Sequence, residues 1–237
     1  MNAENNMVDF NPNEGKSIII DVADRRYERL PIKTHVITDR DRMSEIVTRY
    51  AKPYVRAGDL LFISERVVAI TQGRAFPIKD IKPSWLAKIL VKFVYKSPYG
   101  IGLGSPWTME LAIREAGALR MLLAAAASAL TKPFGMRGIF YRVVGKNINA
   151  IDGPCSYTLP PYNEYAKLGP AKPTKVAREL NEVLGCPVVI IDANDLGAVV
   201  LGKSSLEIDD EWCKKIFRDN PLGQTNEQTP LCIVRRV

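Results

Sequence analysis

The most strongly patterned stretch of this 237-residue chain is Val188-Val-Ile-Ile-Asp-Ala-Asn-Asp-Leu-Gly197. Four apolar β-formers run directly into a polar, acidic segment. A continuous Val/Ile run of this kind is typical of a strand that is buried on both faces of a sheet. Ligands of α/β proteins commonly bind where such strands end. We therefore expect Asp192, Asn194 and Asp195 to lie in a turn where the strand leaves the core.

Before and after this strand in the sequence, short apolar and amphipathic segments predict further strands and helices. The predicted strands are residues 17–22, 26–38, 60–65, 67–71, 138–144 and 231–235, and the predicted helices are residues 41–50, 84–95, 107–116, 119–131, 174–184 and 209–217. We expect the helix over residues 84–95 to bury Trp85, Leu86, Ile89, Leu90, Phe93 and Val94. Residues 153–173 contain five prolines and predict a long structured loop, a kind of segment that is usually functional.

Composition indicates a globular protein, with 46% hydrophobic and 25% charged residues. No apolar run approaches the ~20 residues that a membrane helix needs, and the first residues lack the basic start and apolar centre of a signal peptide. We therefore expect a cytoplasmic protein without a membrane partner. Residues 1–15 are polar and without periodicity, which predicts a flexible N-terminal arm before a domain over residues 16–237.

The four cysteines are far apart and form no C-x-x-C pair, which argues against a zinc finger, an iron–sulfur site or a disulfide framework. The single histidine, His35, excludes a His-rich zinc site. We interpret it as a structural or surface residue rather than a catalytic base. The formal net charge of +7 favours anionic ligands, but no nucleic-acid-binding signature is present, so we do not expect nucleic acid as a partner.

Two glycine-containing segments could be taken for phosphate loops. Gly100, Gly102 and Gly104 precede Ser105, a natural N-cap, so their backbone could approach an anion at the helix start. However, a helix rather than a strand precedes them, which disfavours a Rossmann site. A turn that lets the backbone approach a ligand or a neighbouring strand is the alternative. The Gly202-Lys-Ser segment lacks the first glycine of a Walker motif, and we reject it as a P-loop.

Hard oxygen donors are concentrated beside the predicted strands. Magnesium and manganese prefer such ligands and share them with water and substrate phosphates. The candidates are Asp152, Asp192, Asn194, Asp195, Gln224 and Glu227. Taken singly, each also fits an ordinary turn, because Asp and Asn side chains bond local backbone. Taken together, the segments around Asp152, Asp192 and residues 222–230 predict a site for a divalent metal and a nucleotide phosphate.

Four segments of the chain resemble the coenzyme F420-0:gamma-glutamyl ligase family, and they occur in the family's order. They are Gly58-Asp-Leu-Leu-Phe-Ile-Ser-Glu-Arg-Val-Val-Ala-Ile-Thr-Gln-Gly-Arg74, Asn149-Ala-Ile-Asp152 followed by Leu159-Pro-Pro161, the segment at Asp192, and Leu222-Gly-Gln-Thr-Asn-Glu-Gln-Thr-Pro230 followed by Val234-Arg235. The resemblance spans roughly residues 27–237. It differs at several points: Ile70 stands where the family has a lysine, and Ala193 stands at the second metal position, where Asn194 or Asp195 could substitute. The residues after Asp152, Gly153-Pro-Cys-Ser, also differ from the family pattern.

The resemblance implies a fold, a chemistry and a set of site residues. The fold is a single α+β domain with a mixed, largely antiparallel β-sheet and flanking helices. The chemistry is amide formation between L-glutamate and an acidic acceptor, driven by GTP with Mn²⁺ or Mg²⁺, in a homodimer. Implied metal ligands are Asp152, Asp192 and Gln224; implied nucleotide-contacting residues are Leu30, Pro31, Ile32, Lys33, Glu65, Arg66, Leu222, Gly223, Thr225, Asn226, Gln228 and Thr229.

The residues are also compatible with two other functions. One is a catalytically degenerate relative that binds a nucleotide or another anion as a sensor or partner protein. Intact Asp152 and Asp192 favour the ligase, whereas Ile70 favours this alternative. The other is a polyanion-binding protein, which rests on charge alone and predicts steeply salt-dependent binding.

Overall fold

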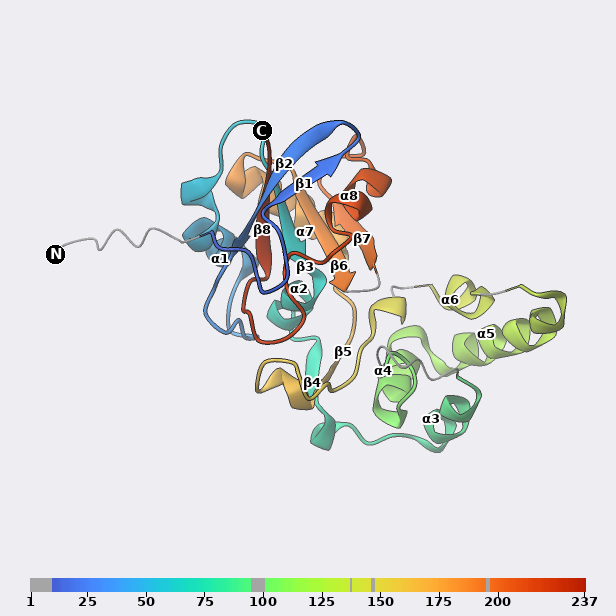
Figure 1. Cartoon of the computed structure of the whole chain (residues 1–237). Helices are drawn as coiled ribbons and strands as arrows, with labels where there is room; N and C mark the ends of the chain where they lie inside the picture. Colours follow the sequence, from blue (N-terminus) through green and yellow to red (C-terminus); the bar gives the residue numbers. More distant parts are fainter. Residues whose placement is uncertain (1–9, 95–100, 137, 146–147, 195–196) are drawn as a thin grey trace. The chain divides into compact units, whose positions relative to one another are not determined.

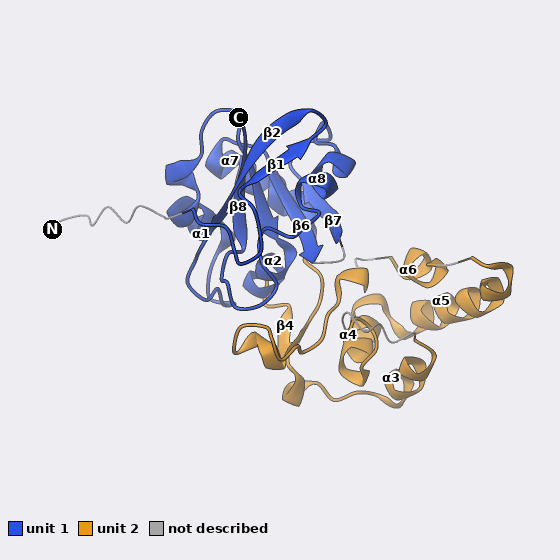
Figure 2. Ribbon diagram, in the orientation of Figure 1, with its two compact units in different colours: residues 1–71, 172–237 blue, residues 72–171 orange. Residues whose placement is uncertain are grey.

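The computed structural model describes residues 10–94, 101–136, 138–145, 148–194 and 197–237. The chain folds into two compact units (Figures 1 and 2), with residues 72–171 forming unit 2 and the segments before and after it forming unit 1. Unit 2 is therefore an insertion in the sequence of unit 1. The predicted α+β class is confirmed.

Unit 1 is built on a six-stranded sheet in the order β1-β2-β8-β3-β6-β7. Its strands are β1 (Ile19–Val22), β2 (Arg25–Ile32), β3 (Leu60–Ser64), β6 (Val188–Asn194), β7 (Gly197–Lys203) and β8 (Leu231–Arg236). Only the β3–β6 pair is parallel in this sheet. The prediction of a mixed, largely antiparallel sheet is thus confirmed.

Helices cover the sheet of unit 1 from both faces. They are α1 (Met43–Tyr50), α2 (Glu65–Thr71), α7 (Pro173–Leu184) and α8 (Asp210–Ile216), with a 3₁₀ turn at Lys52–Tyr54. Phe62 of β3 stacks on Phe217 at the end of α8, with ring centroids 4.4 Å apart. Leu61 and Ile63 point to the other face, because side chains alternate along a strand, and they are fully buried as well.

The Val188–Ile191 run is fully buried, as predicted, but Asp192 and Asn194 lie in the strand rather than in a turn. β6 continues to Asn194 and pairs in antiparallel register with β7, so that Asp192 lies opposite Val199. Sequence reasoning missed β7 altogether. Gly202 in β7 packs closely against α7: a Cβ atom there would lie 2.4 Å from the backbone carbon of Pro173. This glycine therefore serves close packing, in agreement with the rejection of a P-loop.

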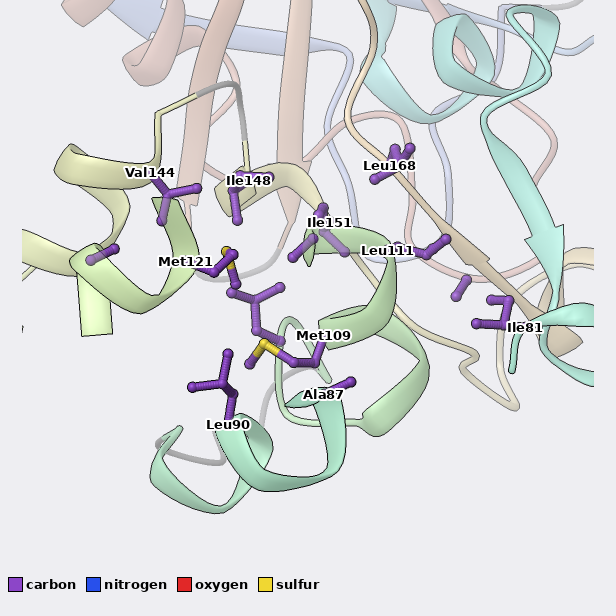
Figure 3. Packing of buried hydrophobic residues seen from close by; sticks show 14 residues of the cluster. Ile81, Ala87, Leu90, Met109, Leu111, Met121, Val144, Ile148, Ile151 and Leu168 are labelled. Carbon is purple, nitrogen blue, oxygen red and sulfur yellow. The ribbon is translucent and has the colours of Figure 1, made fainter. Parts of the chain in front are cut away.

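Unit 2 consists mainly of short helices around a core of its own. Its elements are β4 (Ala75–Pro77), β5 (Tyr165–Lys167), α3 (Trp85–Leu90), α4 (Pro106–Ala116), α5 (Ala118–Thr131), α6 (Ile139–Val144) and 3₁₀ turns at Ile78–Asp80, Val91–Phe93, Lys132–Phe134, Ile148–Ala150 and Tyr162–Glu164. Met109, Leu111, Met121, Val144 and Ile148 meet in this core (Figure 3). The antiparallel β4–β5 pair joins the two ends of the unit.

Two predicted strands are helices in the structure. Val67–Thr71 belongs to α2, where its apolar side chains Val67, Val68 and Ile70 are buried. Ile139–Val144 forms α6, which packs against α5 and buries Val144 in the core of unit 2. Both segments are rich in β-branched and aromatic residues. Such residues prefer strands only weakly, and tertiary packing overrides the preference.

The predicted helix over residues 84–95 is shorter than expected, and its predicted buried face is right only in part: Leu86, Leu90 and Val94 pack against the core of unit 2. Ala87 and Leu90 are buried, whereas Trp85, Ile89 and Phe93 are exposed, Phe93 to 81%.

The helix start after Ser105 is as predicted, because the hydroxyl of Ser105 accepts a hydrogen bond from the N–H of Thr108 in a capping box.

Candidate functional site

The register of the sheet brings three of the predicted nucleotide-contacting segments to one end of unit 1. β8 runs antiparallel to both of its neighbours, and Leu231 at its start lies opposite Ile32 of β2 and Ile63 of β3. The chain therefore leaves β2 at Lys33 and β3 at Glu65 on the same sheet end at which residues 222–230 enter β8. Segments far apart in the sequence are thus neighbours at this end.

Asp192 joins the same sheet end from β6. In the parallel β3–β6 pair, Ser64 lies opposite Ile191. Asp192 and Glu65 are the residues that follow these two paired positions on adjacent strands. Asp192 is half-buried, and Glu65 is almost completely buried. Asn194 is two residues further along β6, and Asp195 lies outside the described residues.

The loop of residues 222–230 is fastened at its ends. The N–H of Ser64 donates to the carbonyl of Pro230 and the N–H of Thr34 donates to that of Gln228, each at 2.9 Å. The buried hydroxyl of Thr229 donates to the carbonyl of Leu222 at 2.7 Å. These bonds hold the end of the loop against β2 and β3 and join it to the start of the loop. The positions of both ends of the loop are therefore fixed relative to the sheet.

Glu227 shapes the middle of this loop. One of its carboxylate oxygens accepts from the N–H of Thr225 at 2.7 Å and the other from the Thr225 hydroxyl at 3.0 Å. Gly223 has a φ of +77°, and a Cβ atom there would lie 2.5 Å from the carboxyl carbon of Glu227. Only glycine therefore fits beneath the folded-back glutamate. The geometry assigns Glu227 a role in holding the loop, while Thr225 and Asn226 are exposed.

The predicted nucleotide contacts from β2 divide into buried and exposed residues. Leu30 and Ile32 belong to the core, and Pro31 lies in the part of β2 that pairs with β8 but not with β1. Lys33 is exposed. A side-chain contact with an anion can therefore come from Lys33, and the three residues before it position this lysine. Arg66, at the start of α2, is half-buried.

Arg29 anchors the segment that leads into the loop, and sequence reasoning missed it. Its guanidinium is 1% exposed and pairs with the carboxylate of Asp219. It also donates to the carbonyls of Ile216 at 2.9 Å and Ser17 at 2.6 Å. Partial burial by itself would raise the pKa of Asp219, but the hydrogen bonds and charge of Arg29 outweigh it and hold this pKa below its usual value. The sequence held one indication of this role, because Arg29 directly precedes the apolar residues Leu30, Pro31 and Ile32 in the predicted strand.

Two asparagines complete the anchoring of the loop. Asn220 is fully buried in a left-handed conformation (φ +48°) and donates to the carbonyl of Gly223 at 2.8 Å. Asn13 donates to the carbonyl of Pro221 and to the hydroxyl oxygen of Thr229, both at 2.8 Å. Residues 1–9 of the predicted arm lie outside the described residues, but Asn13 in its last part is bonded to the loop.

Asp152 belongs to unit 2, where it forms an isolated antiparallel bridge with Lys167. The backbone hydrogen bonds of this bridge are 2.9 and 3.1 Å long. One carboxylate oxygen of Asp152 accepts from the N–H of Gly153 at 2.8 Å. Lys167 is only 5% exposed, and its ammonium donates to the carbonyl of Ala150 at 2.8 Å. A buried lysine next to the aspartate is a further feature that the sequence did not reveal.

The glycine-rich segment before α4 serves packing in the part that the structure describes. Gly100 lies outside the described residues. Gly102 has a φ of +43°, and Gly104 donates to the carbonyl of Ile101 at 2.7 Å. Ile101 in turn packs on Gly153, where a Cβ atom would lie 2.8 Å from its side chain. The segment therefore approaches the chain just after Asp152.

The single histidine has a structural setting. Its ring nitrogens lie 2.9 Å from the hydroxyl of Tyr50 and 3.0 Å from a carboxylate oxygen of Asp41. His35 thereby links the chain after β2 to α1. Among the described residues, no three His, Cys, Asp or Glu side chains are grouped as metal ligands. The cysteines are free thiols, and Cys186, Cys213 and Cys232 are buried.

Comparison with protein families identifies the chain. The model of the F420-0:gamma-glutamyl ligase family matches residues 31–204, which is most of the sequence. The chain belongs to this family. The match includes Asp152, Asp192 and the strand end at Glu65, and it stops before the loop of residues 222–230. No curated protein shows significant sequence similarity to the chain.

No helix in the described part of the chain is both long and apolar enough to cross a membrane.

Proposed function

We propose that the protein is a GTP-dependent amide ligase that requires Mn²⁺ or Mg²⁺ and adds L-glutamate, or a similar amino acid, to an acidic acceptor. Family membership supports the gamma-glutamyl ligase chemistry. The observation that carries the proposal is the meeting of Lys33, Glu65, Asp192 and the loop of residues 222–230 at one end of the unit 1 sheet. By analogy with the family, we also propose a homodimer.

Amide formation needs an activated carboxyl group. In the proposed reaction, a carboxylate oxygen of the acceptor attacks the γ-phosphorus of GTP and GDP leaves, which gives an acyl phosphate. The amino group of glutamate then attacks the acyl carbon, phosphate leaves and the amine loses a proton. A divalent metal held by carboxylate and amide oxygens of this chain would supply positive charge to balance the transferred phosphoryl group. Lys33 and the N–H groups of the 222–230 loop are the groups of this chain suited to hold the nucleotide phosphates.

The oxygen donors of the site suit a hard cation. Magnesium usually takes one or two protein carboxylates and completes its coordination with water and substrate phosphates. Asp192, with the amide oxygens of Asn194 and Gln224, would supply such a set within unit 1. Asp152 stays a candidate carboxylate ligand within unit 2. Glu227 is a weaker candidate, because both of its oxygens accept hydrogen bonds from Thr225.

A non-catalytic nucleotide-binding relative is the second candidate, and Ile70 favours it. This residue stands where the family has a lysine, and it is 4% exposed within α2. An isoleucine in the core cannot supply a cationic phosphate contact. The two candidates differ in turnover rather than in binding: the ligase releases phosphate when amino acid and acceptor are added, whereas the relative binds GTP without releasing phosphate.

The test is thermal unfolding with GTP, GDP and ATP, each with and without Mn²⁺ or Mg²⁺. A ligand at 100 times its Kd stabilises the native state by about 2.7 kcal/mol. For a chain of this size, that free energy raises the melting temperature by roughly 5–10 °C. We expect this rise with GTP plus metal, and we expect Asp192→Asn to abolish its metal dependence.

Asp21→Asn is the matched control, because it removes an exposed carboxylate of β1 that pairs with Arg26. This variant should respond to GTP and metal as the wild-type protein does. An unaltered metal-dependent rise in Asp192→Asn would show that Asp192 does not hold the metal. A rise with GTP but no phosphate release across a panel of amino acids and carboxylic acids would favour the non-catalytic relative.

A further inference from the structure

Helix α5 of unit 2 is apolar on two opposite faces. Met121 and Ala124 are fully buried in the core of the unit, and Figure 3 shows Met121 pointing into it. The opposite face carries leucines at the spacing of one helix stripe. These exposed leucines are Leu119, Leu122, Leu123 and Leu130, with Leu119 and Leu130 more than 70% exposed. A helix that is hydrophobic all round is normally covered on every side.

The exposed apolar surface continues beyond α5. Phe134, in the 3₁₀ turn that follows the helix, is 81% exposed, and Met136 is half exposed. In α3 and the turn after it, Trp85, Ile89 and Phe93 form a second exposed stripe with a spacing of four residues. Large exposed apolar groups of this density mark an interaction site rather than an ordinary surface.

The positive charge of the chain is concentrated in the same unit. Residues 72–171 contain thirteen Lys/Arg and five Asp/Glu, a formal charge of +8, whereas the rest of the chain has 20 and 21. Between residues 81 and 146 the acidic residues are Glu110 and Glu115. Each forms an ion pair with an arginine, Arg114 and Arg74 respectively. Basic residues thus outnumber acidic residues in the part of the sequence that carries the two apolar stripes.

Exposed apolar stripes together with excess positive charge distinguish between three kinds of partner: a second copy of the chain, single-stranded nucleic acid and a lipid bilayer. A second copy of the chain placed on this face by two-fold symmetry would bring two strongly basic units together, and like charges disfavour such a contact. Single-stranded nucleic acid binds to aromatic stacking platforms in basic grooves, whereas the α5 stripe is aliphatic. Leucine, phenylalanine and tryptophan beside lysine and arginine are typical of helices that lie in the interface of an anionic lipid bilayer.

We propose that unit 2 binds the surface of membranes that contain anionic lipids, with the leucine stripe of α5 and Phe134 entering the interface. The attachment is peripheral, and it replaces the expectation from the sequence that the protein has no membrane partner. Apolar burial and attraction between basic side chains and anionic headgroups contribute together. Binding should therefore depend on the lipid headgroup, on salt and on the leucines.

The experiment is co-sedimentation of the full chain with two kinds of vesicle, phosphatidylcholine alone and a 3:1 mixture of phosphatidylcholine and phosphatidylglycerol. We expect binding to the mixed vesicles, which weakens from 0.1 to 0.5 M NaCl because salt screens the headgroup attraction. The double variant Leu123→Glu/Leu130→Glu should lower the partition coefficient at least about tenfold, since burying each leucine is worth more than that factor in free energy. Both positions are exposed, so the fold should survive.

Leu206→Glu is the matched control, because Leu206 is an 83% exposed leucine of unit 1. This variant should bind the mixed vesicles as the wild-type protein does. Equal binding by the α5 double variant, or no binding of the wild-type protein to mixed vesicles, overturns the proposal. If the double variant instead converts a dimer to a monomer in light scattering while vesicles bind neither form, the face is a contact between two copies and the membrane proposal is wrong.

Discussion

Replacing Arg29 measures how much its ion pair with Asp219 contributes to the stability of unit 1. Its guanidinium bonds the Asp219 carboxylate and two backbone carbonyls. Removing one partner of a buried pair costs about 3–5 kcal/mol. Asp219 is 38% exposed, so water can solvate the carboxylate that remains, and we expect Arg29→Met to lower the free energy of unfolding by about 3 kcal/mol, the lower end of this range. Methionine fills most of the volume of the arginine stem.

The assay is urea unfolding followed by the fluorescence of Trp212. This residue contacts the rings of Tyr27 and Phe62 in unit 1. The other two tryptophans, Trp85 and Trp107, lie in unit 2, and their replacement by phenylalanine leaves Trp212 as the single reporter of unit 1.

Arg26→Met is the control on the same strand. Arg26 pairs with Asp21 at the surface, where both side chains are 63% exposed. Such an exposed pair contributes little to stability, because water screens both charges. Equal losses of stability in the two variants would refute the role assigned to Arg29, because burial would then make no difference to the pair.

The pair also predicts how stability depends on pH. The pKa of Asp219 is lower in the folded protein than in the unfolded chain. The stabilisation is therefore fully present above the unfolded pKa of about 3.9 and is lost as the pH falls through the lower folded pKa. The wild-type protein should lose this part of its stability below about pH 4, and Arg29→Met should show a correspondingly smaller loss.

Two further predictions concern close packing and buried thiols. Gly202→Ala would place a methyl group 2.4 Å from the backbone of Pro173, so we expect it to lower the free energy of unfolding by about 1–3 kcal/mol; unchanged urea unfolding would contradict this. Burial raises the pKa of Cys232 to about 12, and the half-buried Cys155 should therefore react first with iodoacetamide in the native protein at pH 8. Mass spectrometry of native and unfolded samples checks the order, and early labelling of Cys232 would count against the described core.

The long runs of the unit 1 sheet could be predicted because their local pattern and their tertiary environment agree. Val188–Ile191 is apolar without interruption and is buried on both faces. Val67–Thr71 has a similar composition but forms part of α2, since the antiparallel ladder of β3 ends at Ile63 and the parallel ladder ends at Ser64. Side-chain preference alone carries no information about where neighbouring strands stop.

The sequence names candidate residues for the site but does not specify their arrangement. Lys33, Glu65 and residues 222–230 are neighbours because β8, the last strand of the chain, lies between β2 and β3, and no local pattern specifies that order. The hairpin of β6 and β7 also depends on pairing, so Asp192 was expected in a turn and is instead within a strand. Lys167 was missed because the burial of a charged side chain depends on its partners, which the sequence does not reveal; Arg29 had a weak signal in the apolar residues that follow it.

The way unit 2 joins the rest of the chain has a consequence for its evolution. Gln72 and Ala171, the two ends of the insertion, are bonded to each other: the Gln72 amide donates to the carbonyl of Ala171 at 3.0 Å and accepts from its N–H at 2.7 Å. The chain thus departs from the sheet-bearing unit and returns to it at a single point. Whatever is attached there can lengthen, shrink or be exchanged while the strand order of the sheet stays the same. The sheet of unit 1 and the surface carried by the insertion can therefore change independently, as separate modules of one gene.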